Sequence, residues 1–121
     1  MGRIVEFTQG EKAFIYFNLS GFQTNDEFEK LIEESKQLIE RYAEGSVYTI
    51  TNIEKVRFDT KTKEIVAGWM TYNKPYVKYG VVIGMDGIKK IMVNAIFSLS
   101  GRKNMTSAST KEQAIEWLMK Q

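Results

Sequence analysis

Short apolar runs alternate along the chain with longer segments whose apolar residues recur every three or four positions. The runs "RIVEFT", "AFIYFNL", "VYTIT" and "VKYGVVIG" are rich in the β-branched and aromatic residues typical of strands. Segments 24–45, 60–72, 86–99 and the stretch from residue 110 have helical spacing, and "KNMTS" predicts a short edge strand. This alternation predicts an α/β fold: one domain over 1–121, with a mixed, largely parallel four- to five-stranded sheet and four helices, in the order ββαβαβαβα.

Local signals at the ends of these segments support the assignment. Thr24 with Glu27, and Thr110 with Gln113, have the spacing of a capping box at the start of a helix. The first helix is expected to end near Gly45, and the single proline ends the second. "QGEK" joins the first two strands as a hairpin, whereas the Tyr48 and Val82 segments are expected to pair in parallel.

The stretch "VVIGMDGIKKIMVNAIF" runs from a buried strand through two glycines into a helix. A phosphate-binding loop needs G-x-x-x-x-G-K-[ST] or G-x-G-x-x-G, and neither spacing is present. The pattern instead favours Gly84 as a tight exit from the strand and Asp86 as the cap of the helix. We therefore do not expect a nucleotide site here.

Composition narrows the functional classes. The chain has 121 residues with neither cysteine nor histidine, which removes the commonest general base, the usual zinc ligands and the thiolate nucleophile. We expect no enzymatic activity, no cofactor and no metal; an enzyme using Asp59 or Asp86 with Lys90 is the remaining catalytic hypothesis.

The net charge of +2 does not indicate a nucleic-acid binder. No apolar run approaches the ~20 residues of a membrane span, so we expect a cytoplasmic protein.

Charge is distributed unevenly. Residues 24–44 contain seven acidic and three basic side chains, whereas residues 74–105 contain six basic and one acidic. Two interpretations stay open: solvated faces of separate helices, or a basic patch that faces an acidic partner.

The third helical segment carries more apolar surface than a surface helix needs. Ile91, Ala95 and Leu99 belong to one stripe, and Val93, Ile96 and Phe97 belong to a second. Burial within the domain, a subunit contact or an apolar ligand cavity would each explain the excess.

The stretches "NKPYVKYGVVIGMDGIKKIMVNAI", "SGRKNM" and "STKEQAIEWL", with "FIYFNLSGF" and "VYTITNI" upstream, resemble the SpoIIAA-like branch of STAS domains, the fold of bacterial anti-sigma factor antagonists. The resemblance extends over the whole chain in the order of its elements. It implies a non-enzymatic regulatory domain that binds a protein or a small ligand. In the antagonist branch a serine after the third strand is phosphorylated, but here Asn52, Ile53, Glu54 and Lys55 follow "TIT". Thr60 is expected to cap the second helix.

Two functional hypotheses follow. The first is a protein-interaction domain, with self-association as one version, that docks through the third helix; its residues are Lys89, Lys90, Val93, Ile96, Phe97, Arg102 and Lys103. The alternative is a small apolar-ligand or lipid-binding domain with a cavity between sheet and helices; its residues are Asn52, Trp69, Met70, Met85 and Met92.

Overall fold

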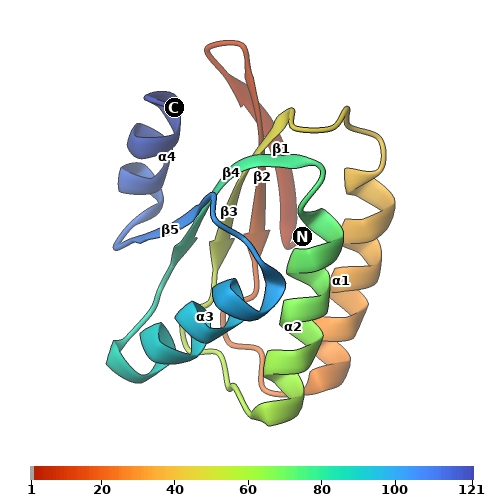
Figure 1. The fold of residues 1–121 in the computed structure, drawn as a ribbon, viewed down its shortest axis with the longest axis vertical. Helices are drawn as coiled ribbons and strands as arrows, with labels where there is room; N and C mark the ends of the chain where they lie inside the picture. The colour runs from red at the N-terminus through yellow and green to blue at the C-terminus, as the bar shows by residue number, and fades with distance from the viewer. Residues whose placement is uncertain (1) are drawn as a thin grey trace.

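The computed structural model describes residues 2–121, which form a five-stranded sheet and four helices (Figure 1). In chain order the elements are β1 (Ile4–Gln9), β2 (Lys12–Asn18), α1 (Asn25–Ile39), β3 (Val47–Asn52), α2 (Thr60–Asn73), β4 (Val77–Ile83), α3 (Gly87–Ser100), β5 (Met105–Ala108) and α4 (Lys111–Met119). The predicted α/β class, with a mixed sheet and four helices, is confirmed.

The strands lie in the spatial order β1-β2-β3-β4-β5. β1 is antiparallel to β2, and each of the other neighbouring pairs is parallel. Tyr48 pairs with Tyr79 and Thr51 with Val82, which confirms the parallel pairing expected of those two segments. β5 is a four-residue edge strand at the opposite side of the sheet from β1.

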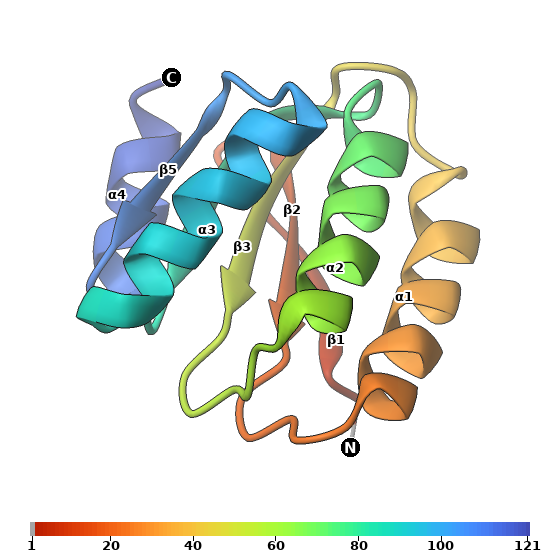
Figure 2. The same cartoon turned by 60° about the horizontal axis from the view of Figure 1, so that its bottom comes forward.

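Helices lie on both faces of the sheet. Figure 2 shows α1, α2 and α3 side by side on one face and α4 on the other. Alternation along β2 explains why both faces need cover, because Ile15 and Phe17 point into the core beneath α1–α3, whereas Phe14 points into the core beneath α4.

The helix caps follow the sequence signals with two corrections. Thr24 and Glu27 form a complete capping box, and the side chain of Thr110 accepts a hydrogen bond from the backbone N–H of Gln113. The second helix is capped by Asp59 rather than by Thr60. The first helix ends at Ile39, earlier than Gly45, because tight three-residue turns replace the α-helical bonding from there onward.

The glycine-containing exit from β4 has a steric cause. Gly84 has φ +85°, and a Cβ atom there would lie 2.6 Å from the backbone nitrogen of Glu54. Two residues later, the side chain of Asp86 accepts a hydrogen bond from the backbone N–H of Lys89 and so caps α3, as predicted.

Candidate functional site: a cavity between the sheet and α2 and α3

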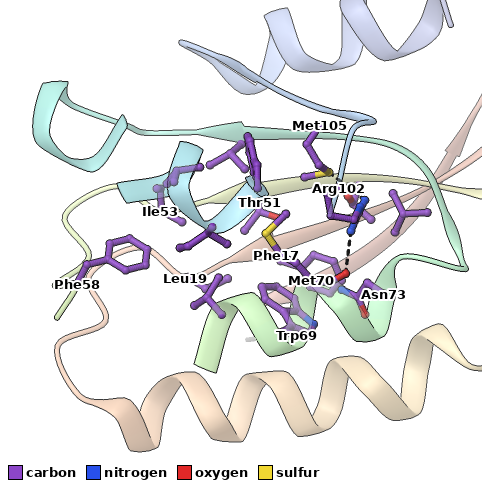
Figure 3. A pocket seen from close by; sticks show the side chains of 17 residues that line it. Phe17, Leu19, Thr51, Ile53, Phe58, Trp69, Met70, Asn73, Arg102 and Met105 are labelled. Carbon is purple, nitrogen blue, oxygen red and sulfur yellow. Dashed lines mark hydrogen bonds between the residues drawn. The ribbon is translucent and has the colours of Figure 1, made fainter. Parts of the chain in front are cut away.

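A cavity lies between the helix-rich face of the sheet and the helices α2 and α3 (Figure 3). We call it the central cavity. Four of its lining residues carry polar side chains: Thr49, Thr51, Asn73 and Arg102. The others are apolar: Phe17, Leu19, Ile53, Phe58, Val66, Trp69, Met70, Val77, Val82, Val93, Ile96, Phe97 and Met105.

The central cavity is small. About 40 Å³ is open to the centres of water-sized spheres. Since one water needs roughly 10–15 Å³ on this measure, the space corresponds to roughly three waters. Its lining is mostly apolar, and apolar cavities of this kind favour apolar occupants over water. The space therefore suits a compact molecule of a few carbon atoms, or a longer one if flexible side chains move.

Trp69 forms a fixed wall of the cavity. It is 3% exposed, and its indole N–H donates a 2.9 Å hydrogen bond to the hydroxyl of Ser35 on α1. Its ring meets that of Phe17 edge to face, with 5.0 Å between centroids. The hydrogen bond satisfies the buried indole N–H and fixes α2 against α1, so this wall is preorganised.

Arg102 reaches the cavity from the turn that ends α3. Gly101 has the left-handed φ of +69°, and the backbone N–H of Arg102 bonds back to the carbonyl of Phe97. This turn directs the Arg102 side chain inward, where the residue is only 6% exposed. Burial lowers the pKa of its guanidinium to about 10.

The guanidinium contacts three neighbours. Its Nε donates to the side-chain oxygen of Asn104 at 2.9 Å, and its Nη1 donates to the carbonyl of Met70 at 3.2 Å. Its Nη2 lies 3.0 Å from the sulfur of Met105, which is a weak acceptor. Arg102 thus joins the last turn of α2 to the start of β5 across the cavity.

Asn73 is the second polar group at this end of the cavity. It is 5% exposed, and its Oδ1 is buried without a hydrogen-bond partner among residues 2–121. Asn73 follows Met70 by three positions on α2, so both lie on the helix face that looks into the cavity (Figure 3). A buried polar atom without a partner is uncommon and costs free energy, which makes it a candidate contact for a ligand.

The structure separates the residues predicted for ligand binding into two groups. Trp69 and Met70 line the central cavity. Met85, Met92 and Asn52 lie outside it. The Asn52 side chain accepts a hydrogen bond from the backbone N–H of Glu54 and donates one to the hydroxyl of Tyr16, and so holds the turn after β3.

The residues predicted for partner docking do not form one exposed surface. Val93 and Ile96 are 4% and 1% exposed and lie in the core under α3, so they are unavailable as surface anchors. Phe97 is half-buried and lines the central cavity. Arg102 is buried rather than at a charged rim. Because α3 turns its second apolar stripe toward the sheet, burial within the domain explains why Val93, Ile96 and Phe97 are apolar.

Of the three lysines in the same prediction, two lie at the surface. Lys90 and Lys103 are exposed. Lys89 is half-buried, with its Nζ 4.0 Å from a carboxylate oxygen of Asp86 and 3.5 Å from the carbonyl of Ile53. Two large apolar side chains of α3 are exposed, Ile91 at 74% and Leu99 at 66%, and both belong to the other stripe.

Sequence reasoning missed Asn73 and placed Arg102 on the surface. A signal for Asn73 was present, since an amide three positions after Met70 lies on the same helix face. Arg102 follows a glycine that ends a helix, which gives no indication of the direction of the side chain.

The catalytic hypothesis gains no geometric support. Asp59 and Asp86 both serve as helix N-caps, and hydrogen bonds from Thr62 hold the pKa of the Asp59 carboxyl below its usual value. Among residues 2–121, no group of three or more acidic side chains is placed to hold a metal ion. None of the helices in that range has the length and apolar character needed to span a membrane.

Comparison with known proteins does not assign a family to this chain. No family model matches the chain, and no curated protein matches it.

Proposed function

We propose that this chain is a non-catalytic ligand-binding domain that holds a small apolar molecule in the central cavity. The observation that carries the proposal is a mostly apolar space beneath α2 and α3 whose lining includes a polar group without a partner. Binding sites for small molecules commonly combine an apolar lining with a few oriented polar groups. The absence of histidine and cysteine from the sequence agrees with a binding role.

The cavity has fixed walls and adjustable ones. Phe17 and Trp69 pack edge to face and define its shape. Met70 and Met105 have flexible, polarisable side chains that can rearrange around a guest. A ligand slightly larger than the open space would therefore be accommodated by movement of the methionines rather than of the helices.

Thermal unfolding in the presence of small apolar probes tests the proposal. A series of primary alcohols from ethanol to octanol should raise the midpoint of unfolding, with a maximum at the length that fills the cavity, because a ligand that binds the folded state alone stabilises it. Val93→Phe, which places a large ring in the cavity, should abolish the shift. Lys90→Gln on the exposed surface of α3 is the matched control. A series in which no alcohol shifts the midpoint contradicts the proposal.

A second candidate is docking to a protein partner, in a regulatory domain of the STAS-like kind. It is favoured by Ile91 and Leu99, which are exposed large apolar side chains eight residues apart on α3, close to the exposed Lys90. These residues, rather than Val93, Ile96 and Phe97, would be the anchors. If the partner is a second copy, light scattering should give a dimer mass for the wild type and a monomer mass for Ile91→Glu. A monomer in both samples excludes self-association.

A further inference from the structure

The polar end of the central cavity has unused hydrogen-bonding capacity on two buried residues. A guanidinium carries five N–H donors, and Arg102 directs three of its nitrogens at one carbonyl, one amide oxygen and one thioether sulfur. Asn73 has a buried side-chain oxygen without a partner. Figure 3 shows both residues at the same end of the cavity, with Met70 between them. This end can bind a polar head group while the remainder of the cavity binds an apolar one.

The charge at this end is positive and uncompensated. Among residues 2–121, no carboxylate lies within 4.0 Å of the Arg102 guanidinium. The residue is only 6% exposed. Burial lowers its pKa to about 10, so the guanidinium remains charged at neutral pH. A buried charge without a counter-charge is costly, and a bound anion would offset this cost.

We propose that the central cavity binds a short-chain carboxylic acid, with the carboxylate on Arg102 and Asn73 and the alkyl tail against Phe17, Trp69 and Ile96. The proposal rests on the ligand-binding function proposed above and adds the class of ligand. A carboxylate matches the planar fork of a guanidinium, and in doing so it would replace the weak contact with the sulfur of Met105.

Asn73 completes the head-group site. A half-turn of its terminal amide exchanges the oxygen for the NH2 group, which can donate a hydrogen bond to a carboxylate oxygen of the ligand. The open volume of about 40 Å³ limits the tail to a few carbon atoms unless Met70 and Met105 move. We therefore expect acids of about three to six carbons to bind better than longer ones.

Calorimetric titration at pH 7 with acids from acetate to octanoate, each paired with the primary alcohol of the same length, tests the proposal. Acids should bind at least about tenfold more tightly than the paired alcohols, because hydrogen bonds to a charged group are the stronger kind. Equal affinities for acids and alcohols would overturn the carboxylate inference and leave the ligand-binding function standing. Absence of binding by both series would overturn both.

Amino-acid substitutions at the polar end of the cavity test where the carboxylate of the ligand binds. Arg102→Gln should reduce acid binding about tenfold or more without reducing alcohol binding. Because loss of Arg102 also removes bonds that join α2 to β5, Asn73→Asp provides a second test. It places a carboxylate at the same end of the cavity, where it should pair with Arg102, raise the midpoint of thermal unfolding and abolish acid binding.

The matched control is Lys103→Gln, which removes an exposed positive charge next to Arg102 in the sequence. Acid binding should stay within about twofold of the wild type, since the exposed charge is screened by solvent. A loss with Lys103→Gln equal to that with Arg102→Gln would place the acid on the surface and overturn the proposal. Unchanged acid binding by Asn73→Asp would overturn it as well.

Discussion

Three helices cover one face of the sheet, whereas α4, with nine residues, covers the other (Figure 2). Beneath α1–α3 the aromatic rings of Phe17, Phe22 and Phe28 are nearly or fully inaccessible. On the α4 face, a row of rings runs across the strands, with centroids 4.9 Å apart for Phe7 and Phe14. Several of these rings, Phe7 among them, remain half-buried.

Long side chains lie over the rim of the α4 face. The ammonium groups of Lys12 and Lys111 lie over the rings of Tyr48 and Tyr16, at 5.3 and 4.4 Å from their centroids. These stems and rings cover apolar surface without sealing it. On the three-helix face, α2 and α3 pack over the sheet, and their side chains leave the central cavity. The face covered by three helices therefore has an apolar space between helices and sheet in which a ligand could be held, whereas the face covered by one short helix is completed by surface side chains.

The largest expected effect is a difference in stability between the two faces. Phe28→Ala removes a ring that is fully buried beside Phe22 and Phe58, and it should lower the free energy of unfolding by about 3–5 kcal/mol. Phe7→Ala removes a half-buried ring stacked on Phe14 and should cost about 1 kcal/mol. Chemical denaturation measures both values. Equal losses would show that the two faces contribute alike to stability.

The same Val→Ile change on the two faces tests whether they differ in packing density. Val93 lines the central cavity, so an added methylene there should raise the free energy of unfolding by up to about 0.8 kcal/mol. Val81 is 0% exposed in the core under α4, and overpacking should cost about 1–3 kcal/mol. Opposite signs in equilibrium denaturation support the difference in packing. A loss with Val93→Ile as large as that with Val81→Ile would contradict it.

The smallest expected effect is at the rim of the three-helix face and depends on pH. Burial and a hydrogen bond from Tyr42 to Glu6 raise the pKa of the Tyr42 hydroxyl to about 12. Since the folded state holds this proton more tightly than the unfolded chain, the contribution is present below about pH 10 and is lost as pH rises toward 12.

Tyr42→Phe should remove this dependence. Denaturation of both proteins at intervals from about pH 9 to pH 12 should show the wild type losing slightly more stability than the variant over the alkaline range. Parallel curves would mean that Tyr42 and Glu6 are not coupled.

Most of the fold could be predicted because its signals are local. The box of Thr24 and Glu27 and the cap at Asp86 depend on residues three apart, and the structure contains both. The end of the first helix was predicted too late, because its apolar spacing continues past Ile39 while the backbone changes to tighter turns. The spacing of apolar residues indicates which face of a helix they occupy, but it does not indicate where α-helical hydrogen bonds give way to tighter turns.

The candidate site could be predicted only in part. The sequence indicated that Trp69 and Met70 face a space between helix and sheet, since large apolar residues at helical spacing point inward. It could not show that Val93 and Ile96 point toward the sheet while Ile91 and Leu99 point to solvent. Both stripes of this helix are apolar, so the choice depends on how the helix is rotated against its neighbours.

The α/β class, the parallel pairing of the Tyr48 and Val82 segments, the caps at Thr24 and Asp86, and the absence of histidine and cysteine chemistry could all be derived from the amino-acid sequence. These properties follow from short-range patterns and composition. The burial of Arg102 beside the last turn of α2, in contrast, depends on how distant segments pack in three dimensions. A side chain that follows a left-handed turn can point outward or inward, and the hydrogen bond from Arg102 to the carbonyl of Met70, 32 positions away, selects the inward direction.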